Sequence, residues 1–165
     1  MNGAFSAVIG VAVLGWVIWN QVRVREFTPR RVRIAGVLGI VGVVEIAQAT
    51  GVAQVSTLGW ALLATGLVVG AVLGVLRAAT VNLWVADGRV LTQGHWVTAA
   101  LWLLGIGVHV GLDALAGVVA PSAATLNSSS ILLFIAVGLG TQGLVTMQRA
   151  RALPGAPAMT LERVR

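Results

Sequence analysis

The sequence predicts an all-α polytopic membrane protein with five transmembrane helices. Of its 165 residues 58% are apolar, and the mean hydropathy is +0.94. Only 10% of the residues are charged, whereas a soluble domain commonly devotes about a quarter to charge. A globule of this size cannot hide so much apolar surface from water, so the composition excludes a water-soluble fold.

The charges are clustered, and the stretches between the clusters predict where the helices lie. Residues 1–22 carry no charge, residues 34–76 carry only Glu45, and residues 90–148 carry only Asp113. Since crossing a bilayer takes about 20 helical residues, the first stretch holds one span and each of the others holds two.

Small and polar residues at 48–57, and a proline-containing segment at 120–130, divide the two long stretches. The predicted helices are residues 3–22, 34–54, 57–79, 96–119 and 129–148. They form one domain over residues 1–150, which a flexible cytoplasmic tail of residues 151–165 follows.

The eleven arginines predict the orientation. Five lie in residues 23–33, Arg77 and Arg89 flank the loop between the third and fourth helices, and four follow residue 148. The positive-inside rule assigns these segments to the cytoplasm, with the amino terminus outside and the carboxyl terminus inside a bacterial cytoplasmic membrane. The arginines are juxtamembrane and discontinuous, so we expect anionic lipid headgroups as partners and no nucleic acid.

Two further patterns concern local structure. Residues 83–91 are rich in β-branched side chains and are interrupted by Asp87-Gly88, which predicts a short cytoplasmic β-hairpin between the third and fourth helices. Gly66, Gly70 and Gly74 recur every four residues, and we expect them to allow close helix packing within the chain in preference to a dimer seam.

The candidate site consists of polar residues inside the predicted helices. An acidic or basic group at mid-helix costs about 2.5 to 3.5 kcal/mol to insert, so such groups usually face the bundle interior. At about 1.5 Å per residue, Glu45 and His109 lie roughly 13 to 14 Å from the outer ends of their helices, and Gln48 and Asp113 roughly 7 to 9 Å. Each helix presents its two residues on one face, and opposed faces would form a two-rung polar cluster in the outer half of the bilayer.

Three functions fit this cluster. The first is a binding bundle or accessory subunit, in which Glu45, Gln48, His109 and Asp113 contact a small hydrophobic molecule or a lipid. The second is a structural subunit with a membrane-protein partner, where the polar groups form only interhelical hydrogen bonds, the role we expect for Gln142. The third is an intramembrane acid–base enzyme of the cyclase or isomerase type acting on an isoprenoid-like substrate, with Glu45, His109 and Asp113 as catalytic residues.

No cofactor or metal is expected. The chain has no cysteine, which excludes thiolate nucleophiles, thiolate zinc sites and covalently attached haem. His95 and His109 are about 21 Å apart along one helix and cannot ligate the same haem. The spacing of Glu45, His109 and Asp113 matches no specific metal motif.

The arginine-rich loop after the first helix, the glycine-rich third helix that runs into residues 83–91, and the following residues 96–107 resemble the CcdC-like family of small bacterial membrane proteins. The resemblance covers most of residues 1–150. It implies an integral membrane protein associated by name with cytochrome c biogenesis and without an established reaction. It assigns no functional residue, and the missing cysteines argue against a thiol-redox role.

Overall fold

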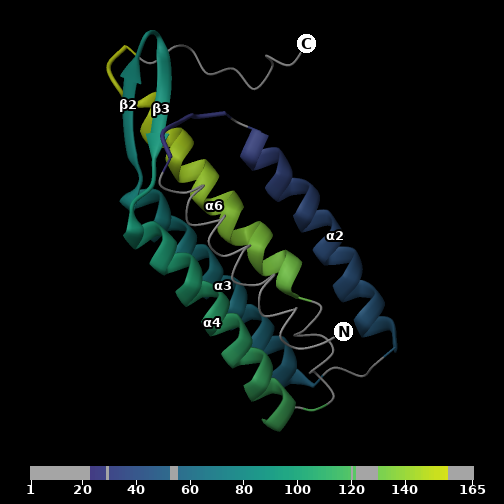
Figure 1. Cartoon of the computed structure of the whole chain (residues 1–165). Helices are drawn as coiled ribbons and strands as arrows, with labels where there is room; N and C mark the ends of the chain where they lie inside the picture. Colours follow the sequence, from purple (N-terminus) through teal and green to yellow (C-terminus); the bar gives the residue numbers. More distant parts are fainter. Residues whose placement is uncertain (1–22, 29, 53–55, 120, 122–129, 156–165) are drawn as a thin grey trace, which may run out of the picture.

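The computed structural model describes residues 23–28, 30–52, 56–119, 121 and 130–155, which form four helices and one small sheet (Figure 1). The helices are α2 (Arg30–Val52), α3 (Thr57–Thr80), α4 (Trp96–Val119) and α6 (Ile131–Arg151). The strands are β1 (Arg25–Glu26), β2 (Asn82–Ala86) and β3 (Arg89–Gln93).

Three of these helices, α3, α4 and α6, are long and apolar enough to cross a membrane. The prediction of five such helices is therefore not supported. The first predicted helix, residues 3–22, lies outside the described residues, as do the last ten residues of the predicted tail. The helix α2 begins at Arg30 and not at residue 34, because arginine is a good helix former and the arginine block continues the helix instead of ending it.

The helix α6 holds the central position. It packs along α3 on one side and along α2 on the other, while α4 packs against α3 (Figure 1). Both α3 and α6 run toward the sheet and are parallel to each other. The helices α2 and α4 start near the sheet and run away from it.

Glycines set how closely α3 approaches its neighbours. A Cβ atom added at Gly74 would lie 2.6 Å from the carbonyl oxygen of Gly138, and one added at Gly70 would lie 3.1 Å from the ring of Phe134. Both contacts are with α6, whereas Gly66 faces α4. The predicted close packing within the chain is confirmed, because real Cβ atoms do not fit at Gly74.

The predicted hairpin is also confirmed. Strands β2 and β3 pair antiparallel, and the turn places Asp87 at φ 50° and Gly88 at φ 69°, the positive values that a two-residue hairpin turn requires. The structure adds a strand that the sequence pattern did not predict: β1 pairs with the free edge of β3, with Arg25 opposite Thr92. A two-residue strand is too short to leave a periodic signal.

The sheet is anchored on the carboxyl-terminal end of α6. A small apolar core joins them, made of Phe27, Val90, Met147 and Ala150. Beside this core, Arg149 donates hydrogen bonds from Nη1 to the carbonyl oxygens of Ala78 and Val81, the latter at 3.0 Å. One arginine of α6 therefore satisfies backbone acceptors at the end of α3.

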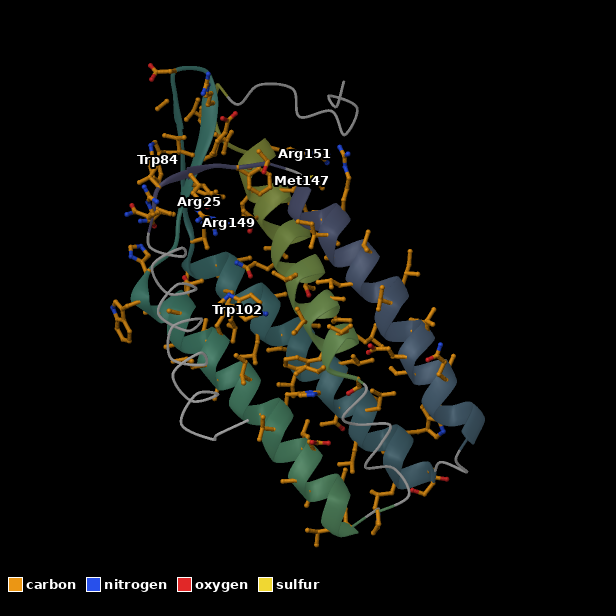
Figure 2. All side chains as sticks on the ribbon, turned by 45° about the vertical axis from the view of Figure 1, so that its right-hand side comes forward. Arg25, Trp84, Trp102, Met147, Arg149 and Arg151 are labelled. Carbon is orange, nitrogen blue, oxygen red and sulfur yellow. The ribbon has the colours of Figure 1, made fainter. Side chains whose placement is uncertain are left out.

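The arginines of the described residues gather at this sheet end, where Figure 2 shows Arg25, Arg149 and Arg151. Arg89 also lies here and forms an exposed ion pair with Glu26 at 3.5 Å. At the opposite ends of α2, α3, α4 and α6, the described residues include no arginine.

The glycine contacts predict a difference between two matched substitutions. We expect Gly74→Ala to lower the free energy of unfolding by about 1 to 3 kcal/mol, because the added methyl group forces α3 away from the backbone of α6. Gly107→Ala on α4 is the control, since a Cβ there meets no described atom within 4 Å. Thermal unfolding in detergent measures both, and equal loss of stability in the two variants would contradict the close contact of Gly74 with α6.

Candidate functional site

The structure places His109 and Asp113 on the bundle side of α4. His109 is only 6% exposed, and its ring lies 5.0 Å from the ring of Phe134 on α6. Asp113 is half-buried one turn farther along α4. This pair therefore shares one helix face, as its four-residue spacing predicts.

Glu45 and Gln48 lie on α2, away from this pair. Glu45 is half-buried and Gln48 is exposed. In both views α6 lies between α2 and α4 (Figures 1 and 2). The structure therefore does not bring the four residues into one two-rung cluster.

The reason is that α2 packs against α6 through apolar side chains. Ile46, next to Glu45, forms a buried cluster with Leu63 of α3, and Leu133 of α6 packs against it. Across the described ranges of the chain, no three His, Asp or Glu side chains are grouped so that they could hold a metal ion. Ligand binding by Glu45, Gln48, His109 and Asp113 stays a prediction.

A different polar cluster lies in the half of the bundle nearer the sheet, and we call it the Arg77 cluster: Arg77 of α3, Trp102 of α4 and Gln142 of α6. Arg77 is only 4% exposed, and its guanidinium carbon lies 3.9 Å from the centroid of the Trp102 ring. Its Nε donates a hydrogen bond of 3.2 Å to the carbonyl oxygen of Leu73 in its own helix. A cation stacked on indole contributes about 0.5 to 2 kcal/mol.

The third member of the cluster is placed by the register of α3 against α6. A Cβ atom at Gly138 would lie 2.6 Å from Nη2 of Arg77, so any other residue there would make the guanidinium shift. Gln142 follows one turn later on the same face of α6 and is 8% exposed. Because Gly70 opposes Phe134 and Gly74 opposes Gly138, the parallel register brings Gln142 level with the turn that holds Arg77.

Hydroxyl groups fix the helix ends around this cluster. Thr80 Oγ1 donates to the carbonyl oxygen of Arg77 at 2.9 Å and lies 2.9 Å from Oγ1 of the fully buried Thr98. Thr98 Oγ1 in turn accepts a hydrogen bond of 3.2 Å from the backbone N–H of His95. The end of α3 is thereby tied to the start of α4, which holds Arg77 and Trp102 together.

The Arg77 cluster has unused hydrogen-bonding capacity. Trp102 Nε1 and Gln142 Oε1 are buried without a hydrogen-bond partner among the described residues. Within the same residues Arg77 forms no ion pair. An unsatisfied buried polar atom costs about 1 to 3 kcal/mol, and an unpaired buried charge costs several. The cluster is therefore a positively charged site in which Trp102 adds a donor, and Gln142 an acceptor, without a partner among the described residues.

Sequence reasoning assigned Arg77 to the edge of a loop and Gln142 to helix packing, and it gave Trp102 no role. The available signal was positional. Arg77 lies inside the predicted helix 57–79 and Trp102 inside 96–119, both within about two turns of the same end. A cation and an aromatic ring at similar depth on consecutive helices suggest a contact, whereas the level of Gln142 follows only from the register of α3 against α6.

No family model, no curated protein and no solved structure matches the chain. The resemblance to the CcdC-like family therefore stays a prediction.

The unpaired acceptor Gln142 Oε1 predicts that an apolar substitution at this position stabilises the protein. In ligand-free protein we expect Gln142→Met to raise the free energy of unfolding by about 1 kcal/mol, because it replaces an unsatisfied buried amide with an apolar side chain of similar volume. Gln148→Met, at an exposed position of the same helix, should change stability by less than about 0.5 kcal/mol. Thermal unfolding in detergent compares them, and a clear loss of stability in Gln142→Met would show that the amide is satisfied.

Proposed function

We propose that the chain is a multi-pass protein of a bacterial cytoplasmic membrane that binds a small amphiphilic molecule, such as a lipid, among its helices. Its outer surface supports the membrane location. Large apolar side chains are exposed along all four described helices, among them Ile40, Val68, Leu104, Val110 and Val118. A surface of this kind fits hydrocarbon and not water.

The arginine-rich sheet end faces the cytoplasm in this proposal. The positive-inside rule supports this orientation, because the described arginines gather at one end of the bundle. Anionic headgroups of the cytoplasmic leaflet are then the natural partners of the exposed arginines.

One observation carries the binding function: Trp102 Nε1 and Gln142 Oε1 are buried without a hydrogen-bond partner in the part of the chain that the structure describes, where Arg77 also forms no ion pair. Native proteins pair the large majority of their buried polar groups, so two buried polar atoms without hydrogen-bond partners favour a bound ligand that pairs with both. The polar end of an amphiphile supplies a partner for each. Its apolar part then lies along the lipid-facing helix surfaces.

The arrangement of the other polar residues supports binding over catalysis. An acid–base enzyme built on Glu45, His109 and Asp113 needs these groups in one site, but α6 lies between the helices that carry them. As ligand contacts, Glu45 with Gln48 and His109 with Asp113 act in this proposal as two separate pairs.

A structural subunit is the second candidate, because α4 has an open face. Cβ atoms at Gly107 and Gly111 meet no described atom within 4 Å, and small residues at this spacing allow another helix to approach closely. A partner chain on this face would favour the structural role.

Native mass spectrometry of the gently extracted protein tests the binding function. We expect the chain to carry an adduct with the mass of a membrane lipid or a smaller amphiphile. The double variant Trp102→Phe/Gln142→Met removes the free donor and acceptor and should lower adduct occupancy about tenfold. Trp96→Phe, at a position 76% exposed on the same helix, should leave occupancy unchanged. A bare chain would refute the proposal, and a bound second polypeptide would support the structural alternative.

The orientation is testable because the chain has no cysteine of its own. We expect Ala152→Cys, at the sheet end, to be protected from a membrane-impermeant thiol reagent in intact cells. Thr57→Cys, at the opposite end of α3, should react. Both positions are exposed, so the two variants control for each other. The reverse labelling pattern would overturn the orientation.

A further inference from the structure

We infer that the Arg77 cluster binds an anionic phosphate group that carries a neighbouring hydroxyl, as in the headgroup of an anionic glycerophospholipid, presented from the leaflet at the sheet end. This inference rests on the proposed binding function and names its ligand class. It follows from the charge of the cluster, from its depth and from the two unused polar atoms.

The charge selects an anion. Arg77 is 4% exposed and forms no ion pair among the described residues, and its guanidinium has already used Nε on the carbonyl oxygen of Leu73. Trp102 covers one face of the guanidinium plane. The donors that remain are on Nη1 and Nη2, and two parallel N–H groups at the edge of a guanidinium match two oxygens of a phosphate.

The depth selects a headgroup. Arg77 lies three residues before the end of α3 and Trp102 six residues after the start of α4, about 5 Å and about 9 Å from the sheet-side ends. The guanidinium lies deeper than this backbone position, because Nε of Arg77 donates back to the carbonyl oxygen of Leu73, seven residues and about 10 Å before the end of α3. In the proposed orientation the cluster thus lies in the sheet-side third of the bundle, nearest the headgroups of that leaflet. A phospholipid in that leaflet brings its phosphate to the cluster while its acyl chains stay against the exposed apolar side chains of the helices.

The two polar atoms without partners favour a headgroup that both accepts and donates hydrogen bonds. Trp102 Nε1 is a donor only, and it fits a phosphate oxygen next to those that Arg77 binds. Gln142 Oε1 is an acceptor and needs a hydroxyl or an amine. A glycerol headgroup offers a hydroxyl beside its phosphate, whereas a choline headgroup carries no N–H or O–H group.

A purely structural arginine is the competing explanation. In that case the guanidinium holds α3, α4 and α6 together through Trp102 and the Gly138 backbone, and no anion is involved. The two explanations differ in what added lipid does to the protein. Exposed arginines favour anionic headgroups under either explanation, but only a headgroup site makes this preference depend on Arg77 and Trp102.

The experiment uses the full chain, delipidated in a non-ionic detergent. Phosphatidylglycerol, phosphatidylcholine or inorganic phosphate is added, and the unfolding midpoint and the native mass spectrum are recorded. We expect phosphatidylglycerol to raise the midpoint and to bind at least tenfold more tightly than phosphatidylcholine. An equal effect of inorganic phosphate at the same concentration would support the phosphate site and assign its source to the free anion.

Variants separate the site from the fold. Arg77→Gln should weaken phosphatidylglycerol binding at least tenfold. Arg89→Gln removes the same charge from the exposed hairpin and should weaken binding by about fivefold at most, the share of general headgroup attraction at about 1 kcal/mol for each surface arginine. If Arg77→Gln does not fold, Trp102→Phe provides the test, because it keeps the aromatic face under the guanidinium and removes only the N–H. We expect Trp102→Phe to weaken phosphatidylglycerol binding about fivefold.

Two outcomes would overturn the inference. Equal binding of phosphatidylglycerol and phosphatidylcholine is one, and wild-type binding by both Arg77→Gln and Trp102→Phe is the other. If the protein still binds amphiphiles in either case, the proposed function stands and only the ligand class is wrong. If no lipid, amphiphile or phosphate binds the wild-type chain, both proposals fail.

Discussion

The close approach of α3 and α6 at Gly74 and Gly138 is the constraint on which the rest of the structure depends. At this point the backbone of one helix lies where the other would carry a side chain. In a membrane, lipid is as apolar as the helix surfaces, so helices gain stability mainly from close van der Waals contact and interhelical hydrogen bonds. The two glycines provide this contact, and they bring the two helices together in parallel.

The same contact creates the Arg77 cluster. One turn beyond Gly74, the side chain of Arg77 enters the space beside Gly138, because no side chain on α6 blocks it. The indole of Trp102, which is labelled in Figure 2, then covers the guanidinium from α4, with the guanidinium carbon 3.9 Å from the ring centroid. A buried cation is costly without a partner, and cation–π stacking offsets only part of that cost. The cluster therefore combines close helix packing with buried polar atoms that lack hydrogen-bond partners among the described residues. The contacts around Ile46 and Leu63, in contrast, are apolar.

Much of the secondary structure could be predicted from the sequence. Hydropathy and charge spacing located α3 and α4 closely, and Asp87-Gly88 located the hairpin turn. The predicted pairing of Glu45 with His109 failed because depth and periodicity give a residue's height and face but not its neighbouring helix. That choice was made by helix packing: apolar side chains and Gly42, where a Cβ atom would lie 2.6 Å from the backbone nitrogen of Leu133, bring α2 against α6, and Gly74 brings α3 against α6. The role of Arg77 was hidden for a related reason: counted as a charge near a loop, it gave no sign that Gly138 leaves room for it inside the bundle.

The parallel course of α3 and α6 has an electrostatic consequence. Each helix carries partial negative charge at its carboxyl-terminal end, and two parallel helices place these ends side by side, where they repel each other. The guanidinium of Arg149 bridges them, because it extends from the last turn of α6 to the carbonyl oxygens of Ala78 and Val81 at the end of α3. Arg149 thus contributes to the predicted orientation and also neutralises the helix ends. Moving its charge to the opposite end of the bundle would therefore disturb the packing of the helices as well as their direction in the membrane.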